Sequence, residues 1–492
     1  MTMGKKYFMI DTFSNVIYFG SRFISNILVF TLLIGSFSLE EYGVFIFFVT
    51  LLSQLEFIQS GFSASLERFI PLYEDKIDLS NLIGMVSIVY LVFGIMISIL
   101  LWIFSVFSIF DLIQLHNWEE YVDILIFFAP LVWFFKTFSF ALKGSKDFRT
   151  ENSINLFYLI IEVLLIYIML TYDFNLKQIF LATFIIIFLK HFSHFIAFYK
   201  RHVLIINKIS FQRVFEQFQK VKSFSFWNFT SSFSGVIMNQ FDKTLVVLFI
   251  GAASLPIYYG INQFLKFYTA ILGIINSSVI PYFTKKIDTV DNKTFNQFAQ
   301  KGTMISTFIG MTFAGFLIIY SKTIFGLISK EYIIEYSSIF NIGILLFALI
   351  GSRSFVNKLH QCKADYVSLI AKFGIITALL YPIVFYLLTR QFGLSGAILS
   401  PILTHLIIFP FWISKLFKAT SLDVINYFKK IIANFFKIFI VFTPVFYLNH
   451  YMNNGPSVQL IILETIVILT LLYFFDNNQN EHSVLKSFKK LL

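Results

Sequence analysis

The chain has 492 residues, of which 57% are hydrophobic and only 13% are charged, and its mean hydropathy is +0.78. Soluble domains carry about 25% charged residues, so this composition excludes a soluble fold and indicates an integral membrane protein. Most of the formal net charge of +11 comes from basic loops between apolar segments, which need no nucleic-acid partner.

Apolar segments long enough to cross a bilayer follow one another along the whole chain, separated by short polar turns. A membrane-spanning helix needs about 20 predominantly apolar residues, and by this criterion the sequence predicts about 14 helices. Their expected ranges are 11–36, 43–64, 82–110, 119–142, 152–171, 176–199, 223–250, 255–279, 303–321, 333–357, 366–388, 393–414, 430–449 and 457–475. The expected fold is therefore all-α and integral to the membrane.

Basic residues gather in alternate loops, and this bias predicts the orientation of the chain. If the N-terminus is cytoplasmic, the inner loops hold clusters such as Lys143, Lys146 and Arg149, whereas the outer loops hold few Lys and Arg residues. An even number of helices then places both termini in the cytoplasm. The basic inner loops would face anionic lipid.

An amphipathic segment lies between two groups of predicted helices. Phe211, Val214, Phe215, Phe218 and Val221 recur at helical spacing, with charged residues on the other face. This pattern predicts a helix on the inner membrane surface that links two halves of the protein. An ordinary solvated connector is the alternative interpretation.

An internal repeat supports the two halves. Gly35 and Tyr42 recur as Gly251 and Tyr258, and the segment FNL at 174–176 recurs as FGL at 392–394. The offsets lie between roughly 210 and 218 residues, as in transporters built from internal repeats. We predict an N-terminal lobe of six helices at 1–200, a cytoplasmic amphipathic connector at 201–222, a C-terminal lobe of six helices at 223–418, and two appended helices with a cytoplasmic tail at 419–492.

Polar residues follow one face of four predicted helices, 11–36, 43–64, 223–250 and 255–279. Helix-to-helix hydrogen bonding is one explanation for the neutral positions. Full charges near mid-span cost several kcal/mol unless they are paired or hydrated, which favours a wet lumen between the halves. The residues that we predict to line this substrate-binding lumen are Arg22, Asn26, Glu56, Asn239, Asp242, Lys243, Asn262 and Lys266.

The sequence predicts neither an enzyme nor a resident metal or cofactor. His191 and His194 could share a helix face, but no Cys or carboxylate stands at a matching spacing for a metal site. The chain has no G-x-x-x-x-G-K-[ST] loop that would indicate ATP hydrolysis. Its loops are too short to build a catalytic domain. Coupling to H⁺ or Na⁺ stays open.

Three short motifs carry a resemblance to a known family. The segments SLEEYG at 38–43, NQFDK at 239–243 and FGLSGA at 392–397 resemble those of the polysaccharide repeat-unit flippases, which include O-antigen transporters. These proteins belong to the multidrug/oligosaccharidyl-lipid/polysaccharide (MOP) exporter superfamily. The resemblance covers essentially the whole chain. It implies two six-helix lobes that form a V around a cationic lumen, with extra C-terminal helices as in some members.

The resemblance also implies a function. The chain would move undecaprenyl-diphosphate-linked oligosaccharide repeat units across the bacterial cytoplasmic (inner) membrane by alternating access, for O-antigen (lipopolysaccharide) or capsule biosynthesis. A polysaccharide polymerase and chain-length proteins would be partners. A diphosphate needs cations, so Arg22, Lys243 and Lys266 are expected to contact the head group. Asp242 would orient a neighbouring cation or carry a coupling proton.

Three alternatives remain at this point. A lipid II flippase would have a sugar and pyrophosphate cargo of the same chemistry. A cation-coupled multidrug exporter of the same superfamily would need a pocket dominated by carboxylates, whereas the mid-span residues include at least as many cations as acids. A membrane glycosyltransferase or polymerase would need a large outer loop with catalytic residues, and the sequence has none.

Overall fold

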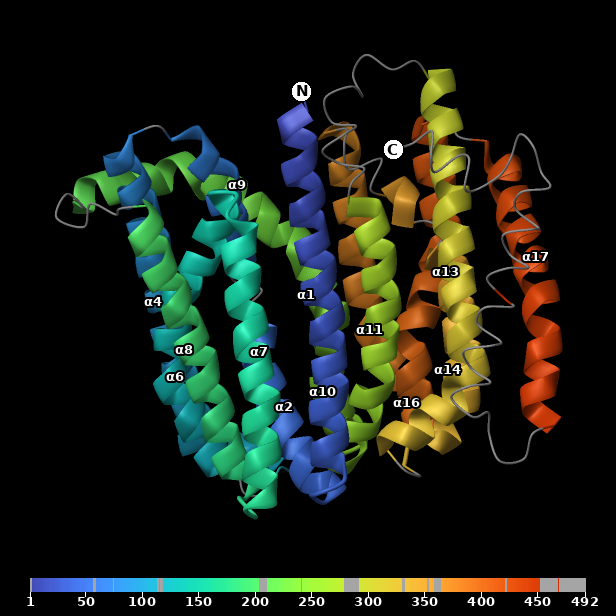
Figure 1. Cartoon of the computed structure of the whole chain (residues 1–492), viewed down its shortest axis with the longest axis horizontal. Helices are drawn as coiled ribbons and strands as arrows, with labels where there is room; N and C mark the ends of the chain where they lie inside the picture. Colours follow the sequence, from blue (N-terminus) through green and yellow to red (C-terminus); the bar gives the residue numbers. More distant parts are fainter. Residues whose placement is uncertain are drawn as a thin grey trace. The chain divides into compact units, whose positions relative to one another are not determined.

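The computed structural model describes residues 2–55, 59–73, 75–112, 115, 118–202, 210–239, 241–277, 292–329, 332–351, 354–357, 364–420, 423–451 and 468 (Figure 1). Within these ranges all regular secondary structure is helical. The chain divides into two compact units, Met1–Tyr259 and Gly260–Leu492.

Seven stretches among the described helices are long and apolar enough to cross a membrane. They are Ile17–Ile34, Lys76–Val106, Glu119–Gly144, Phe148–Thr171, Leu176–His202, Ala299–Ile328 and Lys372–Lys415. These stretches confirm the prediction of an all-helical protein with many spans. The predicted helix 457–475 lies outside the described residues except for residue 468. The full count of about 14 spans stays a prediction.

Unit 1 is a bundle of long helices. Its elements are α1 (Thr2–Ile34), α2 (Leu39–Leu55), α3 (Ser60–Phe69), η2 (Ile70–Leu72), α4 (Lys76–Val106), α5 (Ile109–Leu112), α6 (Glu119–Gly144), α7 (Phe148–Thr171), α8 (Leu176–His202), α9 (Phe211–Asn239), α10 (Phe241–Phe249), η4 (Ala252–Ser254) and the first turn of α11 (Leu255–Ser277). Aromatic rings join α2, α6 and α8: Tyr121 stacks on Phe48 at 5.6 Å between centroids and meets Phe180 edge-on at 4.9 Å. Such pairs add to the large apolar area that each ring buries.

Helix α2 begins at Leu39, four residues before the predicted start of the helix 43–64, and a capping box forms its first turn. The Ser38 hydroxyl accepts a hydrogen bond from the Glu41 backbone N–H at 3.3 Å, and the Glu41 carboxylate accepts one from the Ser38 N–H at 3.2 Å. These reciprocal bonds satisfy two N–H groups that a helix start otherwise leaves without partners. The predicted helix corresponds to α2 and α3, which lie on either side of residues 56–58.

Helix α9 unites the predicted connector with most of the next predicted span. It runs from Phe211 to Asn239 and contains no proline to break it. Figure 1 shows its first part lying crosswise to α4, and the Ser210 N–H donates to the Asn81 side chain of α4 at 3.2 Å. An amphipathic helix that covers helix ends therefore continues directly into the bundle.

Small residues bring α9 close to α3. The hydroxyls of Ser65 and Ser225 are 2.7 Å apart, and a Cβ atom placed on Gly61 would lie 2.4 Å from the Ser225 carbonyl oxygen. The guanidinium of Arg68 lies 4.4 Å from the centre of the Phe224 ring, a cation–π contact. Both residues on the α3 side are small, which lets the two backbones approach as in other membrane helix pairs.

Unit 2 contains the rest of α11, α13 (Asn292–Ser329), η5 (Ile334–Tyr336), α14 (Ser337–Gly351), α16 (Ala364–Thr420) and α17 (Val424–Tyr451). Helix α17, which includes the predicted appended helix 430–449, packs on α13. Its Asn434 side chain donates to the Met304 carbonyl of α13 at 3.0 Å, and Phe442 meets Phe316 edge-on at 5.2 Å. The Asp423 carboxylate accepts from the Asn426 N–H at 3.1 Å and so caps the start of α17.

The helix boundaries repeat at the offsets that the motifs predict. Helix α2 begins at Leu39 and α11 at Leu255, 216 residues later, whereas α6 begins at Glu119 and α14 at Ser337, 218 residues later. The turn between α7 and α8 has its counterpart in α16, where the helix breaks at Gly393. This agreement supports the internal repeat. The predicted lobe boundaries stay a prediction.

Gly393 provides a test of the break in α16. Its φ of 55° and ψ of −134° lie in a region that side chains disfavour, and no atom lies within 4 Å of a Cβ placed there. We therefore expect Gly393→Ala to cost about 1–3 kcal/mol through backbone strain alone. Thermal unfolding in detergent measures this loss against Gly326→Ala, a helical position where the added methyl makes only an ordinary contact at 3.5 Å. Equal melting temperatures for the two variants would contradict the strained turn.

Candidate functional site

Two buried charges of unit 1, Asp242 and Lys243, form an ion pair. The ammonium Nζ of Lys243 lies 2.7 Å from Oδ1 of Asp242, and the two side chains are 1% and 4% exposed. Lys243 is the only charged residue among the largest fully buried side chains of the described chain; the others are aromatic. A buried charge without a partner is strongly destabilising, so each member of the pair depends on the other.

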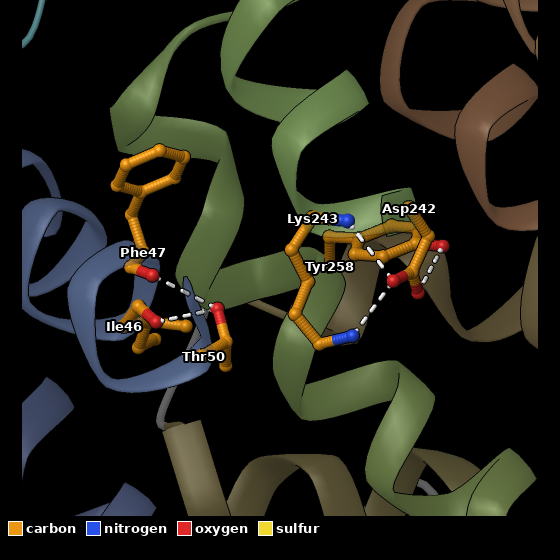
Figure 2. A network of polar contacts seen from close by, with 6 residues as sticks. All are labelled: Ile46, Phe47, Thr50, Asp242, Lys243 and Tyr258. Atoms are coloured by element: carbon orange, nitrogen blue, oxygen red, sulfur yellow. Dashed lines mark hydrogen bonds and ion pairs between the residues drawn. The ribbon is translucent and has the colours of Figure 1, made fainter. Parts of the chain in front are cut away.

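The pair lies at the start of α10. Asp242 occupies the first turn, where the helix dipole stabilises a negative charge. Its Oδ1 also accepts the backbone N–H of Lys243 at 3.0 Å, and its Oδ2 accepts the hydroxyl of Tyr258 at 3.0 Å. Tyr258 belongs to the first turn of α11, so the carboxylate links two helices (Figure 2).

Helix α2 lies on one side of this site. It contacts α10, and Figure 2 shows Thr50 of α2 on the side nearer the pair, with Ile46 and Phe47 one turn earlier on the same helix. Ile46 and Phe47 are buried, and the Thr50 hydroxyl donates to their carbonyl oxygens at 2.8 and 3.1 Å. A water-poor environment strengthens the hydrogen bonds of the pair and raises the cost of leaving one of its charges alone.

The structure brings together Asp242 and Lys243 of the eight predicted lumen residues. Arg22 and Asn26 lie one turn apart on α1, where Arg22 is exposed and Asn26 half-buried. Asn239 ends α9 and so lies close in sequence to the pair. Glu56 lies outside the described residues.

Two predicted residues lie on α11 in unit 2. Asn262 is buried and Lys266 is half-buried. They follow Tyr258 at steps of four residues, so the three side chains share one face of this helix. The Thr269 hydroxyl donates to the Lys266 carbonyl at 2.7 Å.

The polar contacts of two residues of unit 1, Tyr258 and Glu151, were not predicted from the sequence. Tyr258 was used only to define the repeat, yet it completes the hydrogen bonding of Asp242. Glu151 of α7 is buried, accepts from Asn155 at 2.7 Å and from Ser139 of α6 at 3.1 Å, and lies 3.4 Å from the Lys143 ammonium. The spacing of Glu151 and Asn155, four residues apart on one helix, was the feature that could have indicated this cluster.

Comparison with known proteins shows the fold. The sequence matches no protein-family model and no curated protein. The structure is similar to that of the lipid II flippase MurJ in an inward closed conformation, with 15% identity over 96% of this chain and 99% of that chain and a TM-score of 0.70.

Two further structures extend this similarity. An inward-facing multidrug resistance MATE family transporter of the MOP superfamily has 15% identity over 81% of this chain and 95% of that chain, with a TM-score of 0.62. A MOP superfamily transporter from Pyrococcus furiosus Vc1 has 14% identity over 85% and 97%, with a TM-score of 0.54. The chain therefore has the fold of the MOP superfamily transporters.

Proposed function

We propose that this chain is a flippase that translocates undecaprenyl-diphosphate-linked oligosaccharide repeat units across the bacterial cytoplasmic membrane, for O-antigen or capsule biosynthesis. The observation that carries this proposal is the likeness to MurJ, a lipid II flippase, which extends over 99% of that chain. The sequence resemblance to polysaccharide repeat-unit flippases supports the choice of a repeat unit as cargo. Transport would proceed by alternating access between two six-helix lobes, with two appended helices.

The chemistry of the ion pair suits a diphosphate cargo. Asp242 neutralises Lys243 and holds its ammonium in place. A phosphate oxygen offers the same charge-assisted hydrogen bond and could take the place of the carboxylate. Asp242 would orient this ammonium or carry a coupling proton, with H⁺ or Na⁺ as the coupling ion. Arg22 and Lys266 are the further cations that we assign to the head group.

Two other cargoes are candidates. Lipid II is supported by the TM-score of 0.70 with MurJ, and its pyrophosphate would need the same cations. Multidrug export is supported by the MATE transporter fold, but cationic drugs require an acidic pocket. Within the described part of the candidate site, the one buried carboxylate already carries its own cation.

Transport by the purified chain in proteoliposomes tests these three cargoes. We expect a fluorescent undecaprenyl-diphosphate oligosaccharide to cross the bilayer faster than lipid II and much faster than a cationic dye. Equal transport of lipid II would favour the second candidate. Transport of the dye alone would contradict a lipid-linked substrate. Complementation of a flippase-deficient strain gives the same comparison in cells.

A further inference from the structure

A second polar site lies in unit 1 where α7 begins and α8 ends. A cavity of about 510 Å³ is lined there by Asp147, Arg149, Thr150, Ser153, Ile154 and Arg201. None of these residues belongs to the predicted substrate lumen. The lining holds two guanidinium groups and one carboxylate, and Lys146 and Lys200 are their neighbours in the sequence. The cavity therefore carries a net positive charge.

The carboxylate of this cavity is already engaged. One oxygen of Asp147 lies 2.7 Å from Nη1 of Arg201, and the other accepts the Thr150 hydroxyl at 2.7 Å. Asp147 thus fixes the Arg201 side chain, which remains 56% exposed. A guanidinium has five N–H donors, so this ion pair leaves donors on Arg201 for an anion.

Beyond the cavity, exposed apolar residues form a stripe along α7. Only 17% of the α7 span is buried inside the chain, the smallest share among the seven described spans. Ser153 of the cavity is followed on the same helix face by Phe157, Ile160 and Leu164, all of which are exposed. Hydrocarbon chains are the solvent that such a surface requires.

We propose that this cavity binds the phosphate head group of an anionic phospholipid, whose acyl chains lie along the exposed stripe of α7. Basic pockets between membrane helices are known to hold anionic head groups. Arg149 and Arg201 supply the positive charge, and the hydroxyls of Thr150 and Ser153 supply polar contacts to the head group. The proposal concerns a resident lipid and does not depend on the transported substrate.

A native mass spectrometry titration of the purified full chain tests this site. The probes are phosphatidylglycerol, phosphatidylcholine with the same acyl chains, and inorganic phosphate. We expect phosphatidylglycerol to bind more tightly than phosphatidylcholine, and its Kd to rise about fivefold in Arg149→Gln and about 25-fold when Arg201→Gln is added. Asp147→Asn removes the opposing charge, so its Kd should fall.

The Asp147→Asn variant separates binding from folding, because a purely structural role of Asp147 would weaken retention of the lipid rather than strengthen it. Arg213→Gln, at an exposed arginine of α9, is the matched control and should leave the Kd unchanged. Equal affinity for the two lipids, or an unchanged Kd in Arg149→Gln, would overturn the proposal. Displacement of phosphatidylglycerol by millimolar inorganic phosphate would show a soluble-anion site and would overturn the lipid assignment.

Discussion

Replacement of Lys243 by methionine is expected to lower the free energy of unfolding by about 3–5 kcal/mol and to abolish transport. The substitution removes the ammonium that pairs with the Asp242 carboxylate, which is only 4% exposed. The hydrogen bond from Tyr258 and the backbone N–H of residue 243 would remain but could not balance the charge. Thermal unfolding in detergent measures the stability, and the proteoliposome assay measures transport.

The double variant Asp242→Asn and Lys243→Met separates the two effects. Removal of both members of a buried ion pair is often neutral for stability, so this variant should regain most of the loss. It should still fail to transport, because it lacks the Lys243 ammonium that we assign to the diphosphate. If the double variant transports normally, the pair has only a structural role, and our assignment of Lys243 to the substrate is wrong.

Substitution of Gly43 by alanine should destabilise the chain by about 3 kcal/mol or more, since overpacking a rigid contact has no cheap relief. A Cβ atom at residue 43 would lie 1.9 Å from the carbonyl oxygen of Ala252. The carbonyl belongs to the backbone and the position of a Cβ is fixed by the backbone, so α2 and η4 would have to separate. Tyr42, the buried neighbour of residue 43 along the chain, would lose part of its packing.

The control for this variant is Gly20→Ala on α1. No atom lies within 4 Å of a Cβ at residue 20, and alanine in a helix interior is favoured over glycine by about 0.5–1 kcal/mol. We expect this variant to be neutral or slightly more stable than the parent. Two measurements distinguish the Gly43→Ala and Gly20→Ala variants: the fraction of monodisperse protein after detergent extraction, and the melting temperature. Equal behaviour would show that α2 and η4 do not touch as described.

Hydropathy and local chemistry predicted much of the fold. Long apolar segments located the described spans, because lipid requires continuous helices of about 20 residues. Boundaries were less accurate where polar residues continue a helix. Helix α9 starts at Phe211, within the predicted connector, since an amphipathic surface helix and a buried helix have the same backbone and no proline separates them.

The candidate site was harder to predict than the fold. The sequence identified Asp242 and Lys243 as costly charges, but adjacent side chains on a helix point about 100° apart, so their mutual pairing could not be inferred. It depends on the lysine folding back at the start of α10. The role of Tyr258 depends on where α11 begins relative to α10, a tertiary contact that hydropathy does not encode.

The close contact between α3 and α9 limits where the chain can be cut into two fragments. The sequence repeat places α9 with the second half, yet α9 packs on α3 and α4 and lies in unit 1. A fragment that ended after α8, where the repeat divides the chain, would leave Gly61 and Ser65 without the surface of Ser225 that covers them. If the chain is divided as the predicted repeat divides it, the first half therefore depends on a helix of the second half for its packing. If the chain is cut after α8, the two fragments would have to be expressed together, because the second fragment supplies the helix α9 that packs on α3 of the first.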